Sequence, residues 1–346
     1  MLNRLKVQKI IKGKTILVTG GTGSFGKTIA SALLKYKPQQ IRIYSRGEDK
    51  QEQMKFLFKG DKTFKFILGD VRDKSQLERV MKGVDYVFHA AAQKQVPGTE
   101  INVLEGVKTN VLGAQNVIDV SIAAGVKKAI AISTDKAVEP INAMGMTKAL
   151  QERLFIGANT YKRGSTVFSC VRYGNVLGST GSVLPLFLKQ LKSNGPLTIT
   201  HKEMTRFLIT LDEAVNLVLE ALIHSVGGEI FIPDIQSHSI IDLSDALYDL
   251  FPLKKGSTRL VGIRPGEKLH ETLISPNESL CSVKKDNYYI IYPITSNPIL
   301  LKKHSSQINK KYYRYSSDTA KRLTKVELRS ILSKNDLVKE AIAPSA

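Results

Sequence analysis

The sequence of 346 residues is poor in cysteine, in acidic side chains and in long apolar segments. Two cysteines, Cys170 and Cys281, are too few for a disulfide framework or a cysteine-based metal cluster, and they fit a reducing cytoplasm. No apolar run approaches the roughly 20 residues that span a bilayer, so we expect no membrane insertion. The first residues, MLNRLKVQKIIKGKT, also lack the continuous apolar stretch of a secretory signal. We therefore expect a cytoplasmic protein that holds no metal and whose cysteines are unpaired.

The shortage of acidic residues leaves 51 basic against 31 acidic side chains and a formal net charge of +20. Such an excess of positive charge can favour binding to nucleic acid, to an anionic membrane surface or to phosphorylated small molecules. The lysines are scattered rather than gathered into arms, and few aromatic residues are interleaved with them. This pattern favours a lysine-rich solvated surface, so we expect no nucleic-acid partner.

What the sequence does contain is a regular alternation of apolar strands and amphipathic helices. Strands are expected at 14–19, 40–44, 64–68, 84–89, 128–133 and 167–171, with helices at 27–36, 75–81, 107–124 and from Lys148. The alternation predicts an α/β fold, a Rossmann-type doubly wound parallel sheet. We place this core at residues 13–180, with a return strand at about 228–234. A smaller interleaved lobe is expected at 181–285, and a C-terminal extension at 286–346.

Glycines lie in the first turn between strand and helix, where a dinucleotide is bound in such folds. Gly20 permits the tight turn, Gly23 lets the backbone approach a pyrophosphate, and Gly26 lets the helix pack on the strand. The helix N-terminus then faces the phosphates with the positive end of its dipole. The residues expected at this contact are Gly20, Thr22, Gly23, Ser24, Phe25 and Gly26.

The end of the second strand selects the cofactor. An NAD enzyme usually has an acidic side chain there, whereas this chain has Ser45 and Arg46, with Lys50 shortly after. A guanidinium can bind a 2′-phosphate as a fork, so NADP is favoured over the alternative of a solvated Arg46. Further cofactor contacts are expected from Asp70, Val71, Ala90, Ala91, Ala92, Asn110, Ser133, Lys148, Tyr173, Asn175 and Val176.

The fifth strand delivers Thr134, Asp135 and Lys136 to the carboxyl edge of the sheet, where ligands bind in open α/β sheets. One hydroxyl, one carboxylate and one amine are suited to acid–base work on a sugar. Lys148 follows, placed to touch a nicotinamide ribose. Short-chain dehydrogenases normally carry a tyrosine four residues before this lysine, but here the position is Met144, whose thioether cannot transfer a proton.

A set of motifs covers roughly residues 13–285 in one order: the glycine segment, HAAAQKQVP, STDKAVEPINAMGMTK, RYGNVLGS, MTRFLIT and RPGEKLHE. Together they resemble the cytoplasmic UDP-N-acetylglucosamine 4,6-dehydratases of the extended short-chain dehydrogenase superfamily. Within that group, the methionine in PINAMG most resembles the enzymes that also invert carbon 5 and begin routes to bacterial surface polysaccharides. The missing tyrosine is then a feature of a subgroup.

The resemblance implies a lyase that uses NADP without net oxidation. Hydride leaves carbon 4 of the sugar, a base removes the hydrogen on carbon 5, the carbon 6 hydroxyl leaves as water, and hydride returns to carbon 6. By resemblance Lys136 is the base at carbon 5, Asp135 the acid for the leaving hydroxyl, and Thr134 the partner of the oxygen on carbon 4. Lys136 must be neutral, and burial beside Lys148 and a nicotinamide cation could lower its pKa.

Two proton transfers stay open in the sequence. The carbon 4 hydroxyl proton could go to Asp135, to Lys148 or to a water held by Thr134. Inversion requires a proton from the opposite face or a turned substrate, and His89 and Lys94 are nearby candidates. A histidine packed at a strand end is an equally good interpretation of His89.

The lobe at 181–285 would bind the UDP-sugar. Arg206 and Arg264 are of the type that grips a diphosphate, because a planar fork matches two phosphate oxygens. Glu267 could accept a hydrogen bond from the uridine ribose, and Asn175 and Lys94 would flank the diphosphate or the sugar. Relatives form homo-oligomers up to hexamers, so an oligomer from dimer to hexamer is expected.

Three other functions compete with this interpretation. A retaining 4,6-dehydratase is the nearest, since some membrane-anchored relatives also carry methionine, but this chain has INAMG and no membrane region. A non-catalytic NADP-binding regulatory module would make Met144 a mark of lost chemistry, although it would not need the STDK and arginine motifs. A simple 4-epimerase is disfavoured by the missing tyrosine and by the Asp135–Lys136 pair.

Overall fold

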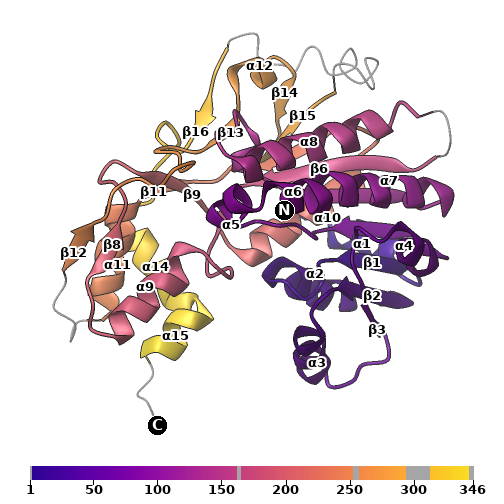
Figure 1. The fold of residues 1–346 in the computed structure, drawn as a ribbon, viewed down its shortest axis with the longest axis horizontal. Coiled ribbons are helices and arrows are strands. Elements are labelled where there is room, and N and C mark those ends of the chain that lie inside the picture. Colours follow the sequence, from indigo (N-terminus) through magenta and orange to yellow (C-terminus); the bar gives the residue numbers. More distant parts are fainter. Residues whose placement is uncertain (1, 162–164, 252–256, 294–311, 343–346) are drawn as a thin grey trace.

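The main sheet is the scaffold of the molecule in this computed structural model, which describes residues 2–161, 165–251, 257–293 and 312–342. The sheet has nine strands in the order β14-β15-β10-β6-β5-β4-β1-β2-β3 (Figure 1). All neighbours from β3 to β10 are parallel, whereas β15 is antiparallel to both β10 and β14. Its strands are β1 (Thr15–Thr19), β2 (Gln40–Ser45), β3 (Phe64–Leu68), β4 (Tyr86–His89), β5 (Lys128–Thr134), β6 (Val167–Tyr173), β10 (Ile230–Pro233), β14 (Ser282–Lys284) and β15 (Tyr288–Ile291). The predicted α/β doubly wound fold is confirmed.

Helices cover both faces of this sheet, which explains why its strands are apolar runs rather than alternating ones. All of β1 is buried, with Ile16 and Val18 in the core on one face and Leu17 in the core on the other. The first face is covered by α1 (Arg4–Ile11), α2 (Ser24–Leu34), α3 (Glu48–Leu57) and α10 (Leu211–His224). The second face is covered by α4 (Lys74–Met81), α7 (Gly113–Ala123) and α8 (Ala143–Ala158).

Short helical segments follow β4 and β5 at the carboxyl edge. They are α5 (Val96–Ile101), α6 (Val103–Gly106), the π-helical turn η1 (Val107–Leu112) and the 3₁₀ turn η2 (Asp135–Ala137). The helix expected from Lys148 begins five residues earlier, at Ala143, because the Asn142 side chain accepts a hydrogen bond from the Gly145 amide at 2.7 Å. Met144 and Lys148 are therefore one turn apart on the same helix face.

A smaller lobe follows β6 and has its own apolar core. It contains β7 (Asn175–Val176), β8 (Leu197–Ile199), β9 (Thr205–Ile209), β11 (Ser237–Ser239), β12 (Thr258–Leu260), α9 (Val183–Lys192) and α11 (Ile240–Leu250). The last described segments are β13 (Thr272–Ile274), α12 (Pro276–Ser279), β16 (Tyr315–Ser316), α14 (Lys325–Lys334) and α15 (Asp336–Ile342). The yellow helices α14 and α15 pack on this lobe, and β16 pairs with β13 (Figure 1).

The segment expected to be a C-terminal extension, 286–346, contributes to both units of the fold. Its first strand, β15, lies in the main sheet, and its helix α14 buries Leu328 and Leu332 in the lobe. A boundary at residue 286 therefore passes through the main sheet.

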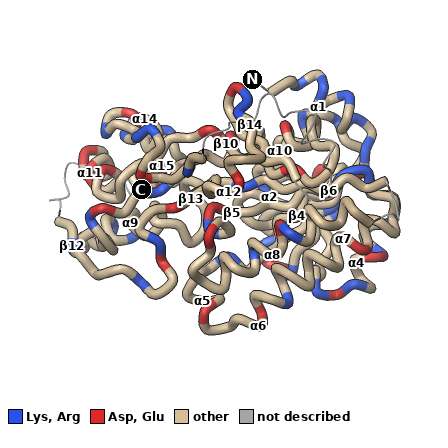
Figure 2. The backbone as a smooth tube through the Cα atoms, turned by 90° about the horizontal axis from the view of Figure 1, so that it is seen from above, with Lys and Arg blue, Asp and Glu red and all other residues tan. Residues whose placement is uncertain are grey.

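Basic and acidic residues are spread over most elements of the fold (Figure 2). Within the described ranges, the helices are all too short or too polar to cross a membrane. Both cysteines are free and buried, Cys170 in the centre of β6.

Candidate active site

A cavity of about 1720 Å³ opens at the carboxyl edge of the parallel strands and extends toward the lobe. Nearly all the residues expected at the site line it. They are Gly20, Thr22, Gly23, Ser24, Phe25, Gly26, Ser45, Arg46, Lys50, Asp70, Val71, Ala90, Ala91, Ala92, Lys94, Ser133, Thr134, Lys136, Met144, Lys148, Tyr173, Asn175, Val176, Arg206, Arg264 and Glu267. Asp135 and Asn110 lie behind the lining.

The glycine segment is shaped to hold a dinucleotide. Gly20 has a φ of 66°, and a Cβ atom there would lie 2.7 Å from the backbone of Ala90 and Ala91. Helix α2 begins at Ser24, and its N-cap, Gly23, has no side chain to occupy the amides of the first turn. These amides and the helix dipole are available to a pyrophosphate, so the residues present fit a nicotinamide dinucleotide.

The end of β2 presents positive charge to the cavity. The Arg46 side chain is 61% exposed, with a nitrogen 3.7 Å from the Asp70 carboxylate. That carboxylate is bound more closely by Arg72, at 2.6 Å. The Ser45 hydroxyl accepts a hydrogen bond from Gln51 at 3.0 Å. Arg46 is therefore only loosely tethered and can turn toward a bound phosphate.

Three ionisable groups meet at the end of β5. Lys136 Nζ lies 3.0 Å from Asp135 Oδ1 and 3.1 Å from Glu271 Oε1. Asp135 is fully buried, and the Thr134 hydroxyl donates to its Oδ1 at 2.9 Å. Only Thr134, Lys136 and Glu271 of this group line the cavity. Any exchange between Asp135 and a ligand must therefore pass through its neighbours.

The charges of this cluster shift each other's pKa values. Burial would lower the pKa of Lys136, but the carboxylates of Asp135 and Glu271 outweigh burial and raise it. Burial raises the pKa of Asp135 in spite of Lys136. Burial acts to raise the pKa of Glu271, yet Lys136 and Arg206 outweigh it and lower that pKa. The expected lowering of the Lys136 pKa is thus not what this arrangement produces.

Glu271 was not singled out from the sequence. It ends the RPGEKLHE motif, and the backbone then continues directly into β13. Ser317, from the C-terminal segment, fixes it: the Glu271 amide donates to Ser317 Oγ at 2.9 Å, and the Ser317 amide donates to the Glu271 carbonyl at 2.8 Å. The motif was the only sequence signal, because the contact with Lys136 exists only in the folded chain.

Lys148 is a buried lysine with unusual surroundings. Its Nζ donates to the Ile132 carbonyl at 2.6 Å and to Gln151 Oε1 at 2.7 Å. Burial lowers its pKa to about 8. A neutral amine has two N–H donors and one lone pair, so two acceptors leave the lone pair unused. Met144, also buried, lies on the same helix face and lines the cavity.

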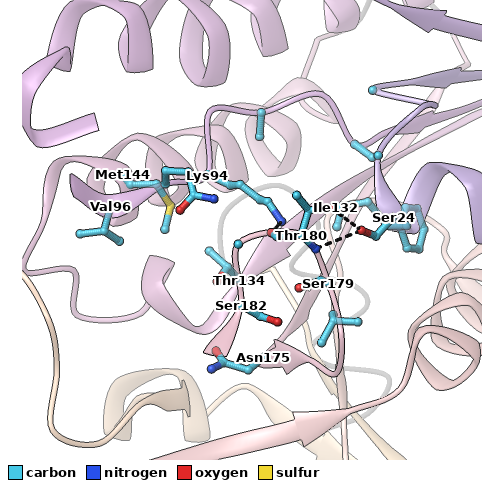
Figure 3. Close-up of a pocket in the computed structure, with 18 of the residues that line it drawn as sticks. Ser24, Lys94, Val96, Ile132, Thr134, Met144, Asn175, Ser179, Thr180 and Ser182 are labelled. Atoms are coloured by element: carbon cyan, nitrogen blue, oxygen red, sulfur yellow. Dashed lines mark hydrogen bonds between the residues drawn. The ribbon is translucent and has the colours of Figure 1, made fainter. Parts of the chain in front are cut away.

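Lys94 reaches across the mouth of the cavity (Figure 3). Its Nζ donates to the Thr180 carbonyl at 2.6 Å, and the Thr180 amide donates to Ser24 Oγ at 3.3 Å. Burial lowers the pKa of Lys94. Through Thr180, the loop between β7 and α9 is therefore hydrogen-bonded both to the glycine segment and to the segment that carries Lys94. Asn175 and Thr134 lie near this loop in the pocket (Figure 3).

The two arginines expected to bind a diphosphate differ in their environment. The Nη atoms of Arg206 donate to three backbone carbonyls at 2.7 to 3.0 Å and to Glu267 at 3.4 Å. Arg206 Nε lies 3.9 Å from Glu271. This guanidinium is buried and holds the RPGEKLHE segment in place. Arg264 is exposed at the cavity rim, which leaves its fork accessible to a ligand.

Two other candidates lie below the cavity surface. The Asn110 amide accepts from the Gln93 amide at 2.8 Å and donates to the Gln93 carbonyl at 2.9 Å, so it shapes the loop that carries Lys94. His89 is fully buried, its Nδ1 lies 2.8 Å from Thr19 Oγ1, and burial lowers its pKa to about 3. These contacts favour a neutral, packed histidine over a proton donor.

Comparison with known proteins gives close matches over most of the chain. Residues 16–293 match the family described as Polysaccharide biosynthesis protein. The chain is 48% identical over 287 residues to a Campylobacter jejuni protein named UDP-N-acetylglucosamine 4,6-dehydratase (inverting), a match that covers 82% of this chain and 84% of that one. It is 44% identical over 337 residues to a Rickettsia bellii protein named UDP-glucose 4-epimerase, covering 95% and 98%. The X-ray structure of Pen from Bacillus thuringiensis superimposes with a TM-score of 0.87 at 36% identity, covering 94% and 99%.

Proposed function

The chain belongs to the polysaccharide biosynthesis protein family, and we propose that it is a UDP-N-acetylglucosamine 4,6-dehydratase that inverts carbon 5. The product would be a UDP-2-acetamido-2,6-dideoxy-hexos-4-ulose for surface polysaccharide or glycan biosynthesis. The observation that carries the proposal is that Thr134, Lys136 and Lys148 line one cavity, with Asp135 bound directly behind Lys136 and a dinucleotide-shaped glycine segment in the same cavity.

The cofactor proposed is NADP, which when bound would accept a hydride from carbon 4 and return it at carbon 6. The amides after Gly23 would bind the pyrophosphate, and Arg46 with Lys50 would bind the 2′-phosphate. At the end of β2, where an NAD enzyme usually has an acidic residue that binds the ribose, this chain has Arg46, which supports NADP over NAD.

We propose that Lys148 accepts the proton of the carbon 4 hydroxyl when the hydride leaves carbon 4. Its two N–H donors are held by Ile132 and Gln151, so in the neutral form its lone pair is free to accept that proton. A pKa of about 8 makes the neutral form accessible near neutral pH. Met144 supplies no proton here; it is a buried apolar side chain in the lining of the same cavity.

Lys136 would remove the hydrogen on carbon 5, which the 4-ketone acidifies. Asp135 would supply the proton for the leaving carbon 6 hydroxyl, because burial raises its pKa and makes it the stronger candidate for an acid. Since Asp135 is covered, its proton would pass through the Thr134 hydroxyl, which donates to Asp135 Oδ1 at 2.9 Å at rest and would turn to accept from it during the transfer.

The nucleotide would lie toward the lobe. Arg264 at the rim and Lys94 under the loop would bind the diphosphate, Glu267 would accept from the uridine ribose, and Asn175 would contact the sugar. Arg206 would keep the RPGEKLHE segment in position rather than grip the phosphates itself.

We also propose that the protein acts in the cytoplasm as a homo-oligomer of two to six copies. Supporting this, α5, α6, η1 and α8 expose Ile101, Leu104, Leu112 and Leu150 at neighbouring positions. Light scattering would test the assembly: a monomer at micromolar concentration would refute it.

The second candidate is a 4-epimerase, which the name of the Rickettsia relative favours. An epimerase returns hydride to carbon 4 and loses no water, whereas the dehydratase loses one water from each sugar. Mass spectrometry of the sugar after incubation with UDP-N-acetylglucosamine and with UDP-glucose decides between them. An unchanged mass with an inverted carbon 4 would establish the epimerase, and no change with either sugar would favour the regulatory module.

A further inference from the structure

The proposed function creates a difficulty at Lys136. It must be neutral to remove the hydrogen from carbon 5, yet it is paired with two carboxylates, Asp135 and Glu271, at 3.0 and 3.1 Å. We propose that Glu271 is the proton acceptor that converts Lys136 into a base. The inference rests on the proposed function, and Glu271 is a positioning residue in it, because it acts through Lys136 and does not touch the sugar.

Of the two carboxylates, Glu271 is the one free to accept. Asp135 Oδ1 is already shared between Lys136 and the Thr134 hydroxyl, and the proposed function gives Asp135 the separate role of the acid at the leaving hydroxyl. Glu271 Oε1 faces Lys136 Nζ directly. Among the described residues, Glu271 Oε2 and Asp135 Oδ2 are both buried without a hydrogen-bond partner, so the distinction rests on Oε1, which has no hydroxyl donor of its own. A buried carboxylate held by so few donors gains from protonation.

The surroundings keep this pair together and make its state sensitive to burial. The charged groups that face Glu271 are Lys136, Asp135, Arg206 and Lys268. Two backbone hydrogen bonds to Ser317 fix the Glu271 main chain, so the carboxylate stays beside the amine. A sugar that enters the cavity displaces water from the pair, and desolvation disfavours the ion pair relative to its neutral tautomer.

The protons of the Lys136–Glu271 pair balance over one cycle, and the proton that Lys148 takes from the carbon 4 hydroxyl is exchanged through water for the one that Asp135 gives to the leaving hydroxyl. An N–H bond of Lys136 breaks and an O–H bond of Glu271 forms, and the neutral amine then takes the hydrogen of carbon 5. After water has left and hydride has reached carbon 6, the sugar turns to present its opposite face, and Lys136 gives a proton back to carbon 5 with inversion. Glu271 then returns its proton to Lys136, which restores the resting ion pair.

The test is the exchange of the carbon 5 hydrogen of the purified 4-keto product into deuterated water, followed by NMR. This assay involves no hydride transfer, so the titration of Lys148, which acts on the carbon 4 hydroxyl, does not affect the measured exchange rate. In the wild type the reactive form is a tautomer of the resting pair, so the exchange rate stays flat between about pH 5.5 and about pH 7.5. In Glu271→Gln the proton must go to bulk water, so the rate is lower and rises about tenfold for each pH unit.

Two further variants make this result specific. Glu271→Asp keeps the acceptor and is expected to keep the flat profile at a reduced rate. Glu139→Gln removes a carboxylate from an exposed ion pair with Arg314 near the same cluster, and its profile should match the wild type. A flat profile in Glu271→Gln would overturn the inference, because loss of packing alone lowers the rate at every pH without changing the slope.

A protein that makes no keto product would refute the proposed function, and the pair is then tested directly. The carboxyl carbon of Glu271 is observed by NMR in glutamate-labelled protein and assigned by its loss in Glu271→Gln. Because Lys136 helps to hold the pKa of Glu271 below its ordinary value, Lys136→Met should raise that pKa. An unchanged titration would show that the two groups share no proton and would overturn the inference.

Discussion

A buried ion triad connects the helix of Lys148 to the segment of Glu271, and its removal should be costly. Arg172 in β6 is only 1% exposed, and it binds Glu152 of α8 at 2.6 and 3.0 Å. It also binds Glu278 of α12 at 2.7 and 3.1 Å and the Leu273 carbonyl at 2.8 Å. The substitution Arg172→Met keeps much of the side-chain volume but leaves the buried carboxylate of Glu152 and the partly buried carboxylate of Glu278 without a cation.

The expected cost is about 3–5 kcal/mol in the free energy of unfolding, because an uncompensated buried charge costs far more than a lost surface pair. Urea unfolding at one fixed cofactor concentration measures it. The matched control is Arg314→Met, which breaks an ion pair with Glu139 whose side chains are both more than two-fifths exposed and should cost only about 0–1 kcal/mol.

The pH dependence of the Arg172→Met deficit gives a second check. In the wild type burial acts to raise the pKa of Glu278, but Arg172 outweighs it and lowers that pKa, so this pair loses stability as pH falls. Without Arg172, burial is opposed only by the hydrogen bonds from Ser275, so the pKa of Glu278 lies higher in the variant than in the wild type and the variant loses less stability as pH falls. The deficit should therefore shrink from about pH 7 toward about pH 5. A deficit below about 1 kcal/mol, or one that grows in acid, would refute this account of the triad.

Three further predictions concern catalysis and binding. The hydride step, followed as NADPH formation in a single turnover, should accelerate up to about pH 8, because it needs neutral Lys148. Lys148→Arg should abolish both the hydride transfer and its rise with pH. A hydride step that does not depend on pH would contradict the assignment. Arg46→Asp should weaken NADP binding at least tenfold and favour NAD in a titration by fluorescence, and equal affinities in both proteins would contradict the 2′-phosphate contact. Arg264→Met should raise KM for the UDP-sugar at least tenfold with little change in kcat, whereas an unchanged KM would place the diphosphate elsewhere.

Much of the scaffold could be predicted from local pattern. The strand β1 is buried on both faces and therefore reads as an uninterrupted apolar run. Gly20, Gly23 and Gly26 lie at the one turn where backbone approach requires them. Thr134 ends, and Lys136 directly follows, a strand whose carboxyl end must face the ligand edge. These features depend on residues close in sequence.

The rest depends on contacts between distant segments. The partners of Lys136 and Arg206 could not be predicted because Glu271 and the carbonyls around it come from more than sixty positions further along the chain. The burial of Asp135 likewise results from the packing of the lobe against the end of β5. From the sequence, the segment that contains β15 is expected to be part of a C-terminal extension. Its place in the main sheet depends on its pairing with β10, which is distant in sequence.

The most direct test of the central claim is incubation of the purified protein with UDP-N-acetylglucosamine and NADP in deuterated water, followed by mass spectrometry and NMR. We predict loss of one water, deuterium at carbon 5, and ring coupling constants of an inverted configuration, all without a tyrosine at position 144. The same loss of water with an unchanged ring would contradict inversion. Tight NADP binding without any turnover would contradict the dehydratase itself.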